Sequence, residues 1–292
     1  MSVMKQTVHL LSGYDMPLVG IGTYKIRGYD TIKRVVDVSL EAGFRSIDTA
    51  VVYGNEEDIG NALQELLLKY NLKREDIFLI SKLAPSDNGN PEAIRKSVEN
   101  SLRALKTNYL DLYLIHWPGA GRILEQSPEN PKRRIDTWTT LVELKQKGFL
   151  KSIGVSNYTV KHLEHLLENC SGVIPDVNQV ECHPHYKQEE LINVCNKKGI
   201  HVQAYSSLGT SNVTTLLEDP VVKEISSELN VSPARVLLRW AVQQGLGIIP
   251  KAIKSEHIKD NIKLDFELSK DHIKKLSNLP QNKYAWDPDN VA

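Results

Sequence analysis

Short β-rich runs alternate with amphipathic stretches along most of the 292-residue chain. Several of the runs, such as Asp111–Trp117, are almost continuously apolar, which is typical of strands covered on both faces. Most runs are followed by an amphipathic stretch of helical length. Eight such units predict an α/β fold, a single (β/α)8 TIM barrel. The eight runs are Leu18–Ile21, Ser46–Thr49, Phe78–Ser81, Asp111–Trp117, Ser152–Val155, Val177–Glu181, His201–Tyr205 and Gly247–Pro250.

Capping signals mark the ends of the predicted helices. Asn55 stands at an expected N-cap before three acidic residues, and Ser232 precedes a proline at a first-turn position. The segment from Val8–Leu11 to Pro17 predicts an added N-terminal β-hairpin. No composition shift or Ser/Gly linker divides the chain, so residues 1–292 are expected to form one domain. The helical stretches include Asp30–Glu41, Glu56–Tyr70, Glu92–Leu105, Asp136–Lys147 and Pro233–Gln244.

Two other classes of protein are disfavoured by motif and charge. A doubly wound dinucleotide-binding sheet needs G-x-G-x-x-G after its first strand, whereas Gly20-Ile21-Gly22 is followed by Lys25 at the position of the third glycine. Basic and acidic residues each number 36, so no global basic field exists to attract nucleic acid or anionic lipid. The three cysteines form no C-x-x-C motif and suit a reducing compartment. We therefore expect a cytoplasmic protein with neither nucleic-acid nor membrane partners, and a monomer by default.

Ionisable side chains stand at the ends of three consecutive predicted strands. These are Asp48, Lys82 and His116, and Tyr53 follows five residues after the first of them. The carboxyl ends of barrel strands meet at one face, where the chemistry of such folds takes place. Ionisable groups gathered there shift one another's pKa values. The pattern therefore predicts an active site at this face of the barrel.

Longer motifs surround these residues in a fixed order. They are Gly43–Ala50, Tyr53–Glu56, Ile80–Leu83, Asp111–Pro118, Gly154–Asn157, Asn178–Glu181, Ala204–Ser206 and Ile249–Lys251. On these motifs the chain resembles the aldo-keto reductase superfamily of aldose and aldehyde reductases, from about Leu11 to Leu279. The resemblance implies NAD(P)H-dependent reduction of a carbonyl to an alcohol, as in an alcohol dehydrogenase (NADP+), with a small-molecule carbonyl as substrate.

The resemblance also implies a catalytic role for each of the four ionisable residues. Tyr53 is the general acid, and its ordinary pKa of about 10 calls for a cation beside it. Lys82 supplies that charge and favours the phenolate, while Asp48 keeps Lys82 oriented and ionised. His116 orients the carbonyl oxygen as a neutral imidazole donor.

NADPH is the cofactor that the resemblance implies, with NADH as a weaker alternative. Lys251 is expected to meet the adenosine 2′-phosphate. The chain departs from the family pattern here, because Ala252 offers no hydroxyl group and His257 replaces an arginine. We therefore expect a weaker preference for NADPH than in relatives that carry the arginine. The other expected cofactor contacts are Gly22, Thr23, Asp48, Ser156, Asn157, Gln179, Tyr205, Ser206, Leu208, Asp260 and Asn261.

The substrate pocket is expected to have apolar walls and one polar end. The proline-punctuated connection Pro118–Ile135 is interpreted as a loop that forms a lid. The tail Tyr284–Pro288 either folds back to add aromatic contacts or is a packed or frayed terminus. The expected lining residues are Tyr24, Val52, Tyr53, His116 and Trp117.

Other histidines receive simpler interpretations. The run Cys182–His185 resembles metal-ligand spacing, but no distant Cys/His pair completes it, and no metal site is expected. His162 and His165 lie on a Lys/Glu-rich helix and are predicted to be solvated. A second function class stays open, namely a binding or structural protein on the same scaffold, like channel subunits and lens crystallins. The four ionisable residues favour the enzyme.

Overall fold

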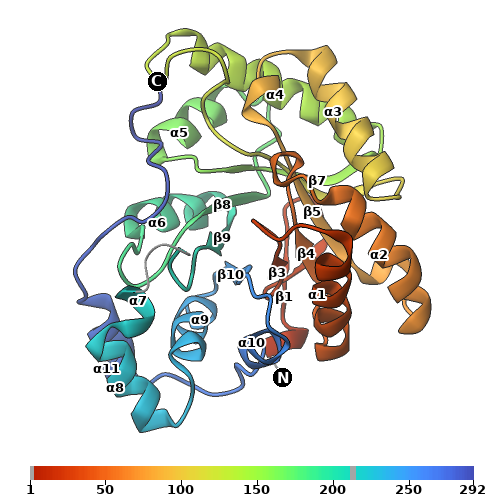
Figure 1. Cartoon of the computed structure of the whole chain (residues 1–292). Helices are drawn as coiled ribbons and strands as arrows, with labels where there is room; N and C mark the ends of the chain where they lie inside the picture. Colours follow the sequence, from red (N-terminus) through yellow and green to blue (C-terminus); the bar gives the residue numbers. More distant parts are fainter. Residues whose placement is uncertain (1–2, 211–214) are drawn as a thin grey trace.

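Eight parallel strands form the centre of the computed structural model, which describes residues 3–210 and 215–292. Their spatial order follows the chain from β3 to β10. Parallel bridges between Val19 and Ile248 and between Gly22 and Lys251 close the sheet, which confirms the predicted barrel (Figure 1). The strands are β3 Ile21–Gly22, β4 Ser46–Asp48, β5 Phe78–Leu83, β6 Leu110–Ile115, β7 Leu150–Ser156, β8 Val177–Glu181, β9 His201–Tyr205 and β10 Gly247–Ile248.

Helices surround this sheet on the outside (Figure 1). Their apolar faces are buried against the strands, with Ile32, Ile94 and Leu237 all inaccessible to solvent. Ser232 caps α9 as predicted, since its hydroxyl accepts from the Arg235 amide at 3.3 Å. The helices are α1 Tyr29–Ala42, α2 Glu56–Lys69, α3 Pro91–Ala104, α4 Glu129–Gln146, α5 Val160–Asn169, α6 Glu189–Lys198, α7 Thr215–Glu218, α8 Pro220–Leu229, α9 Pro233–Gln243, α10 Ser255–Asn261 and α11 Lys270–Ser277. None in the described stretches is long and apolar enough to cross a bilayer.

The predicted N-terminal hairpin is present and closes one end of the barrel. Its strands are β1 Thr7–His9 and β2 Asp15–Pro17, which pair antiparallel. The hairpin residues Leu10 and Met16 are buried with inward-facing strand residues, namely Phe78, Ile80, Leu112, Leu114 and Val177. Because this end is filled by apolar side chains, the other end is where a ligand can enter.

Three local predictions were wrong. Helix α4 begins at Glu129 rather than near Asp136, because Pro128 and Pro131 fit a helix start, so the connection before it is shorter than expected. Asn55 precedes α2, but its side chain makes no capping hydrogen bond. His162, predicted to be solvated, is fully buried because the C-terminal tail covers it. Its Nε2 lies 2.9 Å from the carbonyl oxygen of Val291.

Candidate active site

The four ionisable residues predicted from the sequence lie together at the open end of the barrel. Asp48 is the last residue of β4, and Lys82 is the penultimate residue of β5. His116 follows β6 directly, and Tyr53 closes the short 3-10 helix η2 (Val51–Tyr53) between β4 and α2. The parallel register holds the strand residues at one level, with Lys82 opposite Leu114 of β6.

Lys82 is the central residue of this cluster. Its Nζ donates to both carboxylate oxygens of Asp48 at 2.7 Å and to the carbonyl oxygen of Thr49 at 2.8 Å. The Tyr53 hydroxyl lies 3.3 Å from the same nitrogen. The side chains of Lys82 and Asp48 are 0% and 3% exposed, so this is a buried ion pair. Burial lowers the pKa of Lys82, and the carboxylate of Asp48 opposes that shift.

Burial also controls the protonation of Tyr53 and His116. Burial raises the pKa of Tyr53 well above its usual value, and the negative charge of Asp48 adds to the shift. From the sequence we expect the charge of Lys82 to favour the phenolate and so to lower this pKa. The pKa is raised instead, so the phenol keeps its proton. Burial lowers the pKa of His116 to about 3, and the positive charge of Lys82 contributes. The site therefore places a protonated phenol beside a neutral imidazole, with ring centroids 5.8 Å apart.

Asn55 fixes the loop that carries Tyr53. Its Nδ2 donates to the carbonyl oxygens of Thr23 and Ile26 at 3.0 and 2.9 Å, and its Oδ1 accepts from the Thr49 hydroxyl at 2.6 Å. The side chain thus joins the β3–α1 connection to the β4–α2 connection. Sequence reasoning missed this role because an asparagine before a helix has the same local signature as an N-cap.

The residues predicted to hold a carboxamide lie directly beside the ionisable cluster. Asn157 follows β7, and its Oδ1 accepts from the Tyr205 hydroxyl of β9 at 2.6 Å. The Ser156 hydroxyl donates to the backbone oxygen of Gln179 at 2.8 Å, and the Gln179 Nε2 donates to Asp48 at 2.8 Å. Asn157 has a φ of 64° and Ser206 has a φ of 51°. Left-handed backbone is uncommon at residues other than glycine, and here it turns the chain directly after β7 and β9.

The predicted phosphate-binding residues follow β10. The Lys251 side chain is exposed and forms no ion pair with any described residue. Its backbone bridges to Gly22, which places it next to the cluster around Thr23. The site thus offers the cation of Lys251, the aromatic ring of Tyr205 and the amide side chains of Asn157 and Gln179. Together these groups fit a phosphorylated nicotinamide dinucleotide.

Other residues near Lys251 modify this basic region. Glu256 lies 3.7 Å from His257 and 3.9 Å from Lys254, so a carboxylate offsets part of the positive charge. Arg34 of α1 donates to the carbonyl oxygen of Ile253 at 2.9 Å and adds a guanidinium that sequence reasoning missed. The remaining predicted contacts differ in exposure. Thr23, Ala252 and Asn261 are buried, and the Thr23 hydroxyl donates to the Asp48 carbonyl oxygen. Asp260 accepts from the Ser232 hydroxyl, and Leu208 is partly buried against the core.

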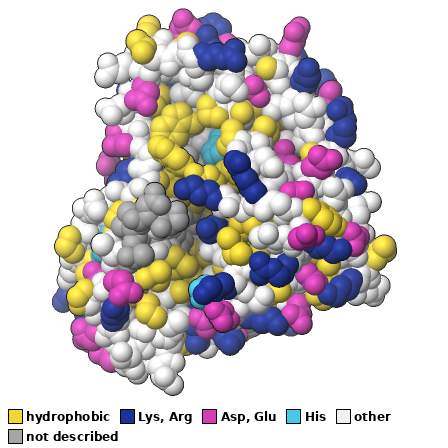
Figure 2. All heavy atoms as spheres, in the orientation of Figure 1, with side chains coloured by type: hydrophobic (Ala, Val, Ile, Leu, Met, Phe, Trp, Pro, Cys, Tyr) yellow, Lys and Arg dark blue, Asp and Glu magenta, His cyan; other side chains and the backbone are white. Residues whose placement is uncertain are grey.

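Aromatic and apolar side chains surround the entrance to the site. The centroid of the Tyr24 ring lies 5.0 Å from that of Tyr53 and 6.2 Å from that of Trp286. Val52, which precedes Tyr53 in the sequence, is half exposed. Trp117 follows His116, and its carbonyl oxygen accepts from Asn88 at 3.0 Å. Figure 2 shows a hollow in which hydrophobic side chains surround a histidine, with basic side chains beside it. This arrangement suits a substrate with an apolar body.

The C-terminal tail folds back over this end of the barrel. The backbone amides of Tyr284 and Ala285 donate to the carboxylate of Glu181 at 2.7 and 2.9 Å. The Tyr284 hydroxyl also bonds to His185 of the Cys182–His185 run. These anchors bring Trp286 to Tyr24, so the tail supplies an aromatic contact. Within the described residues no group of His, Cys, Asp and Glu is arranged to hold a metal ion.

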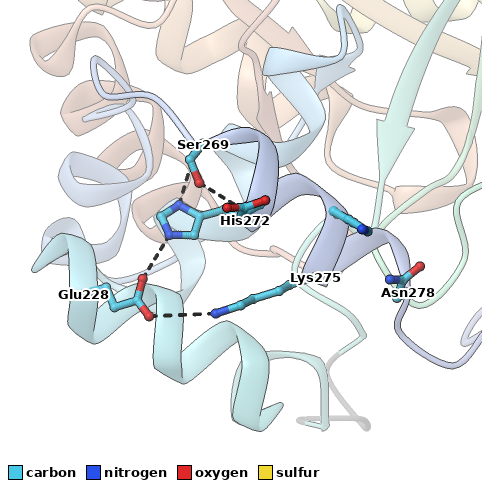
Figure 3. Close-up of a pocket in the computed structure, with 7 residues that line it drawn as sticks. Glu228, Ser269, His272, Lys275 and Asn278 are labelled. Carbon is cyan, nitrogen blue, oxygen red and sulfur yellow. Dashed lines mark hydrogen bonds and ion pairs between the residues drawn. The ribbon is translucent and has the colours of Figure 1, made fainter.

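A second hollow lies between α8 and α11, away from every predicted site residue (Figure 3). Two of its basic side chains pair with glutamates of α8. His272 lies 3.0 Å from Glu228, and Lys275 bonds to Glu224 at 2.6 Å. We therefore assign this hollow no part in the chemistry.

Comparisons with known proteins agree with this geometry. Residues 18–280 match the profile of the aldo/keto reductase family. A glyoxal reductase of Bacillus subtilis is 39% identical, over 94% of this chain and 93% of that protein. The aldo-keto reductase family 1 member A1 of Sus scrofa is 39% identical, over 94% and 89%. The crystal structure of an aldo-keto reductase from a Medee basin deep-sea metagenome library superposes with a TM-score of 0.88 at 33% identity, over 98% and 99%.

The buried ion pair leads to a prediction about stability. The Lys82→Met variant leaves the Asp48 carboxylate buried without its cation, so we expect it to lose about 3–5 kcal/mol of unfolding free energy. Adding Asp48→Asn removes the unpaired charge and should restore most of that loss, although neither variant keeps the site intact. Urea denaturation at pH 7 measures both. A single variant as stable as the wild type would show that the pair is not buried as described.

Proposed function

The chain belongs to the aldo/keto reductase family of oxidoreductases that reduce carbonyl groups, and we propose that it is an NADPH-dependent reductase of aldehydes and ketones. In this proposal it acts as an aldehyde reductase of the alcohol dehydrogenase (NADP+) type. The observation that carries the proposal is the position of Lys82. This buried cation contacts Asp48 on one side and the Tyr53 hydroxyl on the other, 3.3 Å away. A protein that only binds a ligand needs no such proton donor.

The side chains divide the work of reduction. A bound reduced nicotinamide supplies the hydride for the carbonyl carbon. Tyr53 gives its proton to the carbonyl oxygen, and Lys82 balances the negative charge that this leaves on the phenolate. His116, neutral because burial lowers its pKa to about 3, donates a hydrogen bond to the same oxygen. Hydride and proton together convert the carbonyl to an alcohol.

The remaining predicted contacts would hold and orient the cofactor. Ser156, Asn157 and Gln179 carry the polar groups for its carboxamide, and Tyr205 offers a ring for the nicotinamide. Lys251 would meet the 2′-phosphate as an exposed point charge. Tyr24 and Trp286 would contact the apolar part of the substrate.

Replacing the proton donor tests the proposal directly. The Tyr53→Phe variant keeps the ring and loses the acidic hydrogen, so kcat for aldehyde reduction should fall by about 10²–10⁴-fold while the Kd for NADPH stays unchanged. Absorbance of the reduced nicotinamide follows turnover, and Tyr24→Phe is the matched control because its ring is adjacent. If Tyr53→Phe keeps more than a tenth of kcat while chemistry limits turnover, Tyr53 is not the acid. A wild type that turns over no aldehyde would favour the binding-protein alternative.

The phosphate-binding residues predict the strength of cofactor preference. We expect tighter binding of NADPH than of NADH, set mainly by Lys251. The His257→Arg variant should lower the Kd for NADPH by about 1.4- to fivefold, since exposed ion pairs contribute roughly 0.2–1 kcal/mol. The Glu256→Gln variant should act in the same direction because it removes the opposing charge 3.7 Å from His257. Neither should change the Kd for NADH. Equal wild-type affinities for the two cofactors, or no gain in His257→Arg, would contradict the assignment.

The low pKa of His116 predicts a flat acid side of the pH profile. The imidazole works in its neutral form, so activity is lost only as pH falls through its pKa of about 3. With NADPH saturating, kcat should therefore stay within about twofold between pH 5 and pH 8. A decline centred near pH 6.5, the ordinary value for histidine, would show that His116 is not desolvated.

A further inference from the structure

Gln203 lies in β9, inside the barrel, and its side chain is fully buried. Its Oε1 accepts a hydrogen bond from the Nε2 of Gln179 at 2.8 Å. The same Gln179 nitrogen donates to the Oδ2 of Asp48, also at 2.8 Å. Gln203 therefore contacts the ionisable cluster through one intermediate side chain.

Counting hydrogens shows what this contact does. An amide nitrogen has two hydrogens, and Gln179 uses one for Asp48 and one for Gln203. A carboxylate only accepts, so the nitrogen of Gln179 must face Asp48. Two anchor points then fix the rotation of the amide plane. The Oε1 of Gln179 is left as the atom that can accept from a ligand.

The side-chain amide of Gln203 lowers the stability of the fold at this position. Its Nε2 is buried and has no hydrogen-bond partner in the described part of the chain. A buried unsatisfied donor destabilises a fold, and an apolar side chain of similar volume would avoid that loss. Gly247 lies opposite in β10, where a Cβ atom would come within 3.3 Å of the Cγ of Gln203 and within 2.9 Å of the Nε2 of His201, so the absence of a side chain there leaves room for both. Packing alone therefore does not require an amide here.

We propose that Gln203 is a positioning residue that holds Gln179 in the orientation needed to bind a carboxamide. The ligand class is a primary amide, whose N–H donates to the Oε1 of Gln179. This inference rests on the proposed function, because the nicotinamide ring carries that group. Through Gln179, the same contact helps to hold the carboxylate of Asp48 toward Lys82.

The test compares two ligands that differ in the carboxamide. In the Gln203→Met variant the Kd for NADPH should rise about three- to tenfold, the usual effect of losing one buried hydrogen bond. The Kd for 2′,5′-ADP should not change, because this fragment lacks the nicotinamide. Isothermal titration calorimetry gives both constants without turnover. The melting temperature should stay within a few degrees of the wild type, because an unsatisfied amide is removed together with the bond.

Gln243→Met is the matched control for loss of a glutamine. Gln243 is the last residue of α9, and its side-chain amide bonds to the backbone oxygen and nitrogen of Leu268 at 2.8 and 2.9 Å. This variant should melt at a lower temperature and bind both ligands normally. Gln203→Glu is the rescue, since a buried, protonated carboxyl still offers an acceptor to Gln179, and its Kd for NADPH should stay within twofold of the wild type.

Each outcome decides the proposal. Unchanged NADPH binding in Gln203→Met, or equal weakening of NADPH and 2′,5′-ADP, overturns it while leaving the proposed function intact. Loss of NADPH affinity in a folded Gln203→Glu variant overturns it as well, and this variant decides if Gln203→Met does not fold. Absence of NADPH binding in the wild type overturns both proposals together.

Discussion

The site depends on one buried ion pair, between Lys82 and Asp48. A lysine ammonium inside a barrel is stable only where acceptors replace its water, and here two carboxylate oxygens and the Thr49 carbonyl oxygen do so within 2.8 Å. The apolar N-terminal end of the barrel keeps water from the other side. The pair therefore fixes a positive charge 3.3 Å from the Tyr53 hydroxyl without exposing it to solvent.

Asp48 extends this pair across the barrel. Its carboxylate accepts from Lys82 of β5 and from Gln179 of β8, and Gln179 in turn bonds to Gln203 of β9. Strands that are far apart in the sheet are thus joined by side chains at the open end. Asn55 then holds the loop of Tyr53 against this group. Proton donor, cation and carboxamide side chains are therefore held in one hydrogen-bonded arrangement, which is the preorganisation that charge stabilisation requires.

Sequence reasoning could predict the barrel and the four ionisable residues because both follow from local pattern. Parallel strands end at one face, so polar residues at strand ends converge there. Contacts between distant segments were not predictable in this way. His162 lies in a polar helix and is buried only because Val291 covers it. Gln203 stands between Val202 and Ala204 in a short strand, and its partner Gln179 is 24 positions away in the sequence.

Titration of Tyr53 tests the balance of burial and charge most directly. Tyrosinate absorbance should be recorded between pH 7 and pH 11 for the wild type and for Tyr53→Phe, and the difference assigned to Tyr53. Burial raises the pKa of this phenol, so no difference should appear below pH 10. A tyrosinate that forms below pH 9 and is lost in Tyr53→Phe would mean that the charge of Lys82 outweighs burial, and would contradict the account of a protonated donor at rest.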